Sequence, residues 1–226
     1  MENCKIENMY DLDQTMAAEL FEGKTYPWEV LPEIGGFIKK LGETLDPEIY
    51  ENKGENIWIA KSAKVWPTVS ITGPCIIGEN TEVRQCAFIR GNALVGNDCV
   101  VGNSTELKNV VLFNHVQVPH YNYVGDSVLG YYSHMGAGSI TSNVKSDKTL
   151  VVVKDRESGE QIETGLKKFG AMLGNHVEVG CNSVLNPGTV ICPDSNVYPT
   201  SSVRGVVAPH SIFKNAEHIV KKNSLN

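Results

Sequence analysis

The sequence repeats an apolar residue every six positions over much of its length. One run extends from Ile59 to Phe113, and a second with the same period extends from Leu173 to Val203. Ordinary strands repeat every two residues and helices every 3.6, so neither explains the pattern. A period of six is typical of a parallel β-helix, in which each hexad forms one short strand with one side chain inside. The first run consists of Ile59, Val65, Ile71, Ile77, Val83, Ile89, Val95, Val101, Leu107 and Phe113.

Small residues two positions before many of the apolar ones indicate a narrow interior. Ala63, Ala87, Ala93 and Cys99 occupy such positions. Three hexads would form one three-sided coil, and coils would stack at the strand spacing of about 4.8 Å. Sandwich strands would recur every 8–12 residues instead. The sequence therefore predicts a mainly β fold, a single-stranded left-handed parallel β-helix, which is an exception to the usual right-handed crossover.

The period divides the chain into three segments. Residues 1–56 lack it and predict a short α-helical N-terminal arm that caps the open end or covers one side of the β-helix. Residues 57–205 predict the β-helix itself, and residues 206–226 predict an exit segment with a short basic helix.

Within these segments the sequence predicts four further features. Two short helices are expected in the arm, and the hexad register is expected to slip once within the β-helix. A hairpin with its turn near Ser158-Gly159 is expected to leave the coils and pack on a neighbouring subunit. The predicted bounds are Asp11–Glu22 and Glu29–Leu41 for the helices, 119–123 for the slip and 150–165 for the hairpin.

Charge and cysteine usage narrow the classes of partner. Residues 1–56 hold 13 acidic and 5 basic residues, whereas the remainder holds 13 and 15, so the β-helix does not repel a phosphate. The sequence contains no basic stripe with interleaved aromatic residues, so nucleic-acid binding is not expected. No apolar run is long enough to span a membrane. The acidic N-terminus does not resemble a secretory signal. Six cysteines without a C-x-x-C motif predict reduced thiols and a cytoplasmic protein.

Polar side chains that suit acyl transfer gather between residues 90 and 143. Histidine can deprotonate an attacking amine near neutral pH, and His120 lies in this stretch. Arg90 and Lys108 are eighteen residues apart, which would stack two cations on adjacent coils where a phosphate could bind. The glycines on either side of Ala137 allow close approach of a pantetheine arm.

Four segments resemble a known family. AFIRG, ELKN, HYNYVGDSVLG and MGAGSITSN are similar to the acetyltransferase domain of the bifunctional N-acetylglucosamine-1-phosphate uridyltransferase/glucosamine-1-phosphate acetyltransferase family of hexapeptide-repeat acyltransferases. The resemblance covers residues 90–143, resumes at Lys168 and leaves out residues 1–56. It implies an acetyl-CoA co-substrate and an amino-sugar phosphate acceptor. No nucleotidyltransferase activity is expected, because residues 1–56 are too short for that domain and lack its glycine-rich loop.

The resemblance also implies a role for each matching residue. His120 matches the catalytic histidine. The substrate-binding positions are Arg90, Lys108, Tyr123, Asn143 and Lys168, and the acetyl-CoA contacts are Ala137 and Cys181. His134 and Val144 stand where the family has an asparagine and a tyrosine, which bears on the acceptor more than on the acyl chemistry.

Two other functions remain open from the sequence. His115 and His120 have the spacing of the metal-binding pair of prism-shaped carbonic anhydrases, but Glu79 stands where a third histidine would be needed, so no metal is expected. The β-helix could instead be a non-catalytic assembly module. One β-helix offers only a shallow surface, so an enzyme of this kind is expected to be a homotrimer with its sites between neighbouring subunits.

Overall fold

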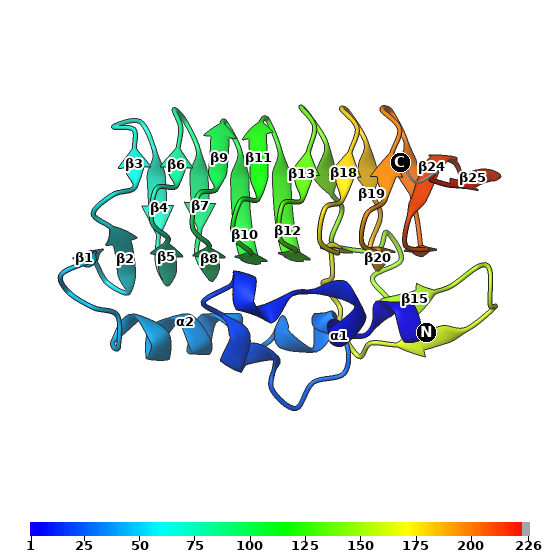
Figure 1. Ribbon diagram of the computed structural model, residues 1–226, viewed down its shortest axis with the longest axis horizontal. Helices are drawn as coiled ribbons and strands as arrows, with labels where there is room; N and C mark the ends of the chain where they lie inside the picture. The colour runs from blue at the N-terminus through cyan, green and yellow to red at the C-terminus, as the bar shows by residue number, and fades with distance from the viewer. Residues whose placement is uncertain (223–226) are drawn as a thin grey trace.

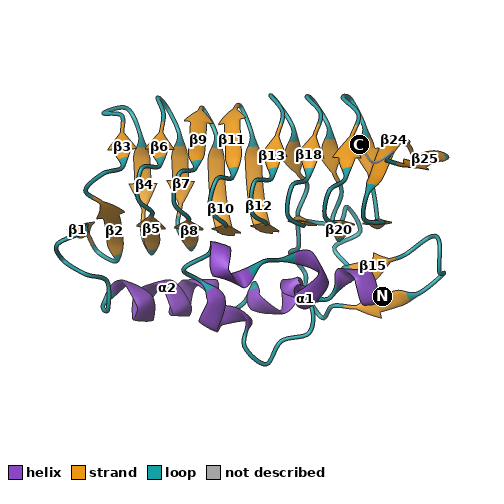
Figure 2. Ribbon diagram, viewed as in Figure 1, coloured by secondary structure: helices purple, strands orange, loops and turns teal. Residues whose placement is uncertain are grey.

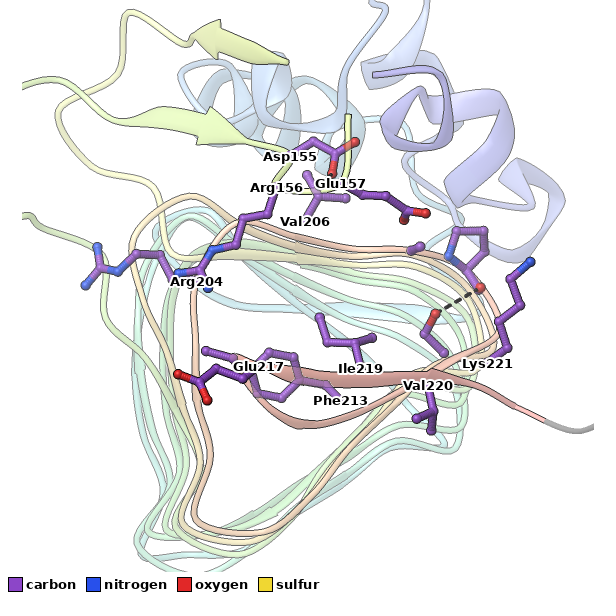
Figure 3. Close-up of a pocket in the computed structure, with 14 residues that line it drawn as sticks. Asp155, Arg156, Glu157, Arg204, Val206, Phe213, Glu217, Ile219, Val220 and Lys221 are labelled. Carbon is purple, nitrogen blue, oxygen red and sulfur yellow. Dashed lines mark hydrogen bonds between the residues drawn. The ribbon is translucent and has the colours of Figure 1, made fainter. Parts of the chain in front are cut away.

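The computed structural model describes residues 1–222 and consists mainly of short strands stacked in parallel coils (Figures 1 and 2). Seen along the stacking axis, the coils have a triangular outline (Figure 3). The protein is thus a parallel β-helix with three faces, as the period of six predicted. Strands β10 and β12 are longer than the others because each turns a corner and belongs to two faces.

The first face carries β2 (Ile57–Ala60), β5 (Cys75–Ile77), β8 (Ala93–Val95), β10 (Glu106–Leu112), β12 (Tyr123–Leu129), β17 (Ala171–Leu173), β20 (Thr189–Ile191) and β23 (Val206–Val207). The second face carries β3 (Lys64–Val65), β6 (Glu82–Val83), β9 (Val100–Asn103), β11 (Gln117–His120), β13 (His134–Met135), β18 (Glu178–Val179), β21 (Asn196–Val197) and β24 (Ser211–Asn215). The third face carries β4 (Ser70–Thr72), β7 (Phe88–Arg90), the first halves of β10 and β12, β14 (Ile140–Thr141), β19 (Val184–Leu185) and β22 (Ser202–Val203).

Two coils are one residue shorter than the rest. The paired residues Ile77 and Val95 are eighteen apart, but Val95 pairs with Leu112 and Leu112 with Leu129. Each missing residue falls at the corner inside β10 or β12, where Asn109 and Asp126 have positive φ angles of 55° and 50°. The prediction of a single slip at residues 119–123 is therefore wrong, since the slip occurs twice and on either side of that stretch.

The first of these short coils changes the role of Phe113. Leu112 continues the interior stack, and Phe113 lies outside it. The Phe113 ring packs against Tyr10 and Phe21 of the N-terminal arm, with centroid distances of 5.0 and 5.8 Å. Because Leu112 and Phe113 are both apolar, the sequence alone did not distinguish which one faces inward.

The N-terminal arm runs along the first face (Figure 1). Outward-facing residues of that face form an apolar column that would otherwise meet water, and all are fully buried: Ile76, Leu94, Val111, Val128 and Met172. The arm covers one side of the β-helix, which was one of its two predicted positions. It comprises η1 (Glu2–Cys4), α1 (Ile6–Met9), η2 (Leu12–Gln14), η3 (Ala18–Phe21), η4 (Pro27–Val30) and α2 (Ile34–Gly42), followed by β1 (Tyr50–Gly54).

The arm is less helical than predicted. Between residues 11 and 22 only the short 3-10 helices η2 and η3 form. Asp11 Oδ1 accepts from the Asp13 amide at 3.1 Å, and Thr15 Oγ1 accepts from the Ala17 amide at 3.1 Å. Side-chain bonds of this kind compete with a continuous helix. The second predicted helix exists as α2, which begins at Ile34 because Pro27–Val30 forms a separate 3-10 turn.

The inserted hairpin of residues 150–165 contains β15 (Val152–Lys154) and β16 (Gln161–Glu163), paired antiparallel. Val151 and Val153 are fully buried within this chain. A Cβ at Gly205 would lie 2.4 Å from the Lys154 carbonyl oxygen, so the hairpin rests directly on a glycine at a corner of its own β-helix. The buried residues of the hairpin thus pack within this chain, and its contact with a neighbouring subunit stays a prediction.

The C-terminal segment contains strands in place of the predicted basic helix. After β23, strand β24 pairs antiparallel with β25 (His218–Lys221), placing Ile212 opposite Val220 and Phe213 opposite Ile219. Apolar residues facing each other across a ladder stabilise a strand pair. Residues 223–226 lie outside the described part of the chain.

Candidate acyl-transfer site

The corner between the second and third faces, here called the histidine corner, gathers three of the predicted site residues. The Gly138 amide donates to the His120 carbonyl at 3.0 Å, and the Asn182 amide donates to the Ala137 carbonyl at 2.8 Å. His120, Ala137 and Cys181 therefore lie one above another on three successive coils, about 4.8 Å apart per coil. The predicted base and the predicted acetyl-CoA contacts form one column.

A buried asparagine fixes the backbone of the histidine corner. Asn122 is 2% exposed, and its Oδ1 accepts from the His120 amide at 3.0 Å. Its Nδ2 donates to the carbonyls of Gly136 and Ser139 at 2.9 and 3.1 Å. The turn that holds His120 is thereby tied to the next turn of the column, while the His120 side chain is exposed. Sequence reasoning did not single out Asn122.

Gly136 is required by the neighbouring coil. A Cβ at this position would lie 2.7 Å from the Cys181 amide nitrogen and 3.0 Å from Cys181 Sγ. The glycine was expected to make room for a pantetheine arm, and the structure shows that it makes room for Cys181. The Cys181 side chain is exposed at the same corner.

The corner between the third and first faces, here called the aspartate corner, holds a second polar group. Asp126 is 3% exposed and accepts from three side chains. Lys108 Nζ lies 2.9 Å from Oδ1 and 3.2 Å from Oδ2. Asn109 Nδ2 donates to Oδ1 at 3.0 Å, and Asn143 Nδ2 donates to Oδ2 at 2.5 Å. Because three side chains donate to its charged carboxylate, Asp126 fixes the positions of the other polar residues at this corner.

The N-terminal arm completes the aspartate corner. Asn109 Nδ2 also donates to the Leu31 carbonyl at 3.1 Å, and Trp28 of η4 packs against Phe169 with a centroid distance of 5.7 Å. Sequence reasoning missed Asn109, Asp126 and the arm. A spacing of seventeen from Asn109 to Asp126 to Asn143 is the signal that could have found them, because seventeen is the length of the shortened coils.

The outer surface of the third face between the two corners carries two further residues that were predicted to bind the acceptor. Arg90 Nη1 bonds Glu106 Oε1 at 2.6 Å, so both predicted phosphate-binding cations, Arg90 and Lys108, are paired with carboxylates. The Tyr123 hydroxyl accepts from Asn143 Nδ2 at 3.3 Å. Partial burial raises the pKa of Tyr123, and the negative charges of Asp126 and Glu106 raise it further.

Lys168 and His134 lie at the margins of the site. Lys168 is exposed and directly precedes Phe169, whose amide donates to the Asn143 carbonyl at 3.0 Å. His134 Nδ1 lies 2.8 Å from Glu178 Oε2 on the second face. The hydrogen bond of Phe169 therefore holds the neighbouring Lys168 close to the aspartate corner. His134 lies on a different surface.

His115 is not a neighbour of His120. His115 lies in the turn before β11, and His120 is the last residue of that strand, so the length of β11 separates them. The His115 ring stacks on Tyr132 with a centroid distance of 4.5 Å. Among residues 1–222 no cluster of three or more histidine, cysteine or acidic side chains could hold a metal ion. Nor does any helix in that range have the length and apolar character to cross a membrane; the cytoplasmic location stays a prediction.

The three-sided coils and their hexad period define a hexapeptide-repeat β-helix protein. The chain belongs to the family described as the GMPPB C-terminal domain, which matches residues 71–207. It is 30% identical over 211 residues to the bifunctional protein GlmU of Methanococcus aeolicus, covering 84% of this chain and 50% of the relative. These matches confirm the resemblance found in the sequence.

A further relative and a solved structure are also similar to this chain. The bifunctional sugar-1-phosphate nucleotidylyltransferase/acetyltransferase of Sulfurisphaera tokodaii is 30% identical over 164 residues, covering 65% of this chain and 40% of that protein. The chain thus spans half or less of these relatives. A hexapeptide transferase family protein from Anaplasma phagocytophilum overlaps 74% of this chain and 79% of its own, with a TM-score of 0.47 and 14% identity.

Proposed function

We propose that the chain is a CoA-dependent acyltransferase that transfers an acetyl group from acetyl-CoA to an amino-sugar phosphate or a similar acceptor. The observation that carries the proposal is the column of His120, Ala137 and Cys181 at one corner of the third face. A polar group that suits a sugar acceptor lies at the other corner. Relatives whose names include acetyltransferase and sugar-1-phosphate activities support the same assignment.

In this mechanism His120 acts as the general base. Its imidazole takes a proton from the acceptor amine as the nitrogen attacks the thioester carbonyl, so a C–N bond forms and the C–S bond breaks. The CoA thiolate leaves and is protonated by the imidazolium. The backbone clamp from Asn122 fixes the position of His120 without engaging its ring, which leaves both ring nitrogens available for this proton transfer.

The aspartate corner would bind the acceptor. Tyr123 and Asn143 present a hydroxyl and an amide to sugar hydroxyls, and Lys168 can reach the same place. Arg90 and Lys108 would hold the phosphate. Because each is already paired with a carboxylate, a phosphate must share these cations with Glu106 and Asp126. We therefore expect weak phosphate binding and stronger dependence on the sugar.

A non-catalytic binding module is the second candidate, and the paired state of these cations favours it. Acetylation assays with glucosamine-1-phosphate and glucosamine separate the two candidates. Turnover of either acceptor supports the enzyme. Binding of acetyl-CoA without release of CoA thiol in the presence of a panel of amino sugars supports the module.

Protection of Cys181 tests the placement of acetyl-CoA directly. Cys181 and Cys86 are both exposed cysteines near the same corner, and each lies two coils from His120, on opposite sides of it. Saturating acetyl-CoA should slow alkylation of Cys181 by about tenfold or more and leave Cys86 unchanged, as measured by mass spectrometry of labelled peptides. Equal labelling of Cys181 with and without acetyl-CoA would contradict the proposed cofactor column.

A further inference from the structure

The inserted hairpin forms a strongly basic pocket with its own β-helix. A cavity of about 370 Å³ lies between β15 and the last coils. Four of its lining residues are cations, none is a carboxylate, and the full lining consists of Lys145, Val152, Lys154, Arg156, Pro187, Arg204 and Gly205. None of these residues belongs to the group around Asp126, although Pro187 lies in register with Asn143 on the next coil of the same corner. The pocket lies where β19 and β22 end, on the far side of the third face from Cys181.

The hairpin contributes two cations and no carboxylate to the lining of the basic pocket. Lys154 ends β15 and Arg156 lies in the turn that follows it, and both line the basic pocket. Asp155 is not in the lining of the basic pocket, and its carboxylate accepts from the Glu157 amide at 3.0 Å and from the Ser158 hydroxyl at 2.7 Å. The acidic residue thus stabilises the turn, and the two cations remain directed at the cavity.

Most of the pocket cations lack an acidic partner. Among residues 1–222, Lys154, Arg156 and Arg204 form no ion pair; Arg204 donates only to Asn186 Oδ1, at 3.0 Å. Lys145 is the exception, with Asp147 at 3.5 Å. Glu163 lies across the ladder from Val152 and is not in the lining. Uncompensated cations held in a concave site are typical of binding sites for phosphate groups.

A second hollow adjoins the basic pocket and shares Arg156 and Arg204 with it. It measures about 460 Å³ and lies at the end of the β-helix. In Figure 3, Arg156 extends from the hairpin toward Arg204 on the coil, and the C-terminal strands form the floor beside them. Phe213, Ile219 and Val220 make this floor apolar, and the acidic residues Asp155, Glu157 and Glu217 stand at its rim.

We propose that the two hollows together bind a nucleoside diphosphate. The diphosphate occupies the basic pocket, the ribose hydroxyls donate to the acidic rim, and the base lies on the apolar floor. Both volumes fall in the range of small-molecule sites, about 300–1,000 Å³. The site is separate from the histidine corner and does not depend on acyl transfer.

Calorimetric titration of the full chain with GDP, ADP and pyrophosphate tests this. We expect a nucleoside diphosphate to bind saturably. Pyrophosphate should bind about tenfold more weakly, because it lacks the base and the ribose. Arg156→Gln and Arg204→Gln should each weaken binding by about tenfold or more, since each removes a charge-assisted contact. Lys61→Gln removes one exposed positive charge elsewhere and should change the affinity less than about twofold.

Unchanged unfolding midpoints would verify that these variants fold. Equal losses in Lys61→Gln and Arg156→Gln, or the absence of saturable binding, would overturn the proposal. Displacement of a bound nucleoside diphosphate by acetyl-CoA would also overturn it, because the pocket would then belong to the co-substrate.

Discussion

Asp126 holds together more of the candidate site than any residue that the sequence pointed to. Three side chains donate to its carboxylate, and one of them also bonds the arm. Asp126→Ala should lower the free energy of unfolding by about 3 kcal/mol, because it strands a partly buried Lys108 and two amides. Denaturant unfolding measures this. Adding Lys108→Met to Asp126→Ala should restore part of the loss, and a purely additive further loss would contradict the pairing.

His120 is expected to act in the reaction and not in folding. His120→Ala should lower kcat by about 10²–10⁴-fold while the dissociation constant for acetyl-CoA and the unfolding midpoint stay unchanged. His134→Ala is the matched control, because His134 pairs with Glu178 on another surface. Equal losses of kcat in both variants would mean that neither is the base.

Two buried thiols make stability depend on alkaline pH. Burial raises the pKa of the Cys75 and Cys99 thiols to about 12. An unfolded thiol ionises near 8.5, so the unfolded state loses protons first as the pH rises. Their contribution to stability is complete below about pH 8.5 and is lost between there and pH 12. Unfolding free energies at pH 8 and 10.5 should show this decline, with a shallower slope for Cys75→Ala; an equal slope in the wild-type protein and Cys75→Ala would contradict it.

At the scale of elements, helix α2 offers a matched pair of glycines. A Cβ at Gly35 would lie 2.4 Å from Asn92 Oδ1, whereas a Cβ at Gly36 would meet nothing within 4 Å. Gly36→Ala should therefore stabilise the protein by about 0.5–1 kcal/mol through helix propensity. Gly35→Ala should lose this gain, because the Asn92 side chain must rotate away to make room for the new methyl group. Thermal unfolding of the two variants compares them, and similar midpoints would contradict the observed docking of α2.

The same elements show what the sequence could and could not predict. The β-helix was predictable because each coil needs an apolar residue at a fixed interval, whatever surrounds it. The two shortened coils were not, because Leu112 beside Phe113 leaves either residue able to fill the interior. Strand β25 resembled a basic helix end because its apolar partners on β24 are contacts that only folding brings together.

Part of the candidate site could be predicted from the sequence, and part could not. His120, Ala137 and Cys181 share a corner because the hexad period stacks them, and the period was visible in the sequence. Asp126 could not be predicted, because its importance comes from hydrogen-bond donors on neighbouring coils. One of these donors, Asn109, also bonds the Leu31 carbonyl of the arm. Spacing reveals which residues share a column, but it does not reveal which of them are buried together.

At the scale of the whole molecule, the shallow third face predicts self-association. Tyr121 directly follows His120 and is 64% exposed. If the site lies between subunits, this ring is buried by a neighbour, and light scattering should show a trimer at micromolar concentration. Tyr121→Glu should shift the mass toward the monomer and reduce acetylation.

Tyr132→Glu is the control for this experiment. Tyr132 is 45% exposed at a different corner, where it stacks on His115. A monomeric wild-type protein, or equal effects of the two substitutions, would contradict a trimer built around the histidine corner.

The antiparallel strands at both ends of the stack set a limit on growth. Each parallel coil presents a row of amide and carbonyl groups onto which another coil could add, so a solenoid with bare edges can act as a template for fibrils. Strand β1 runs against β2, and β25 runs against β24, so neither edge continues the parallel ladder. On these two faces a second copy cannot extend the stack in register. Association is thereby directed to the flanks of the molecule, where it can close on itself.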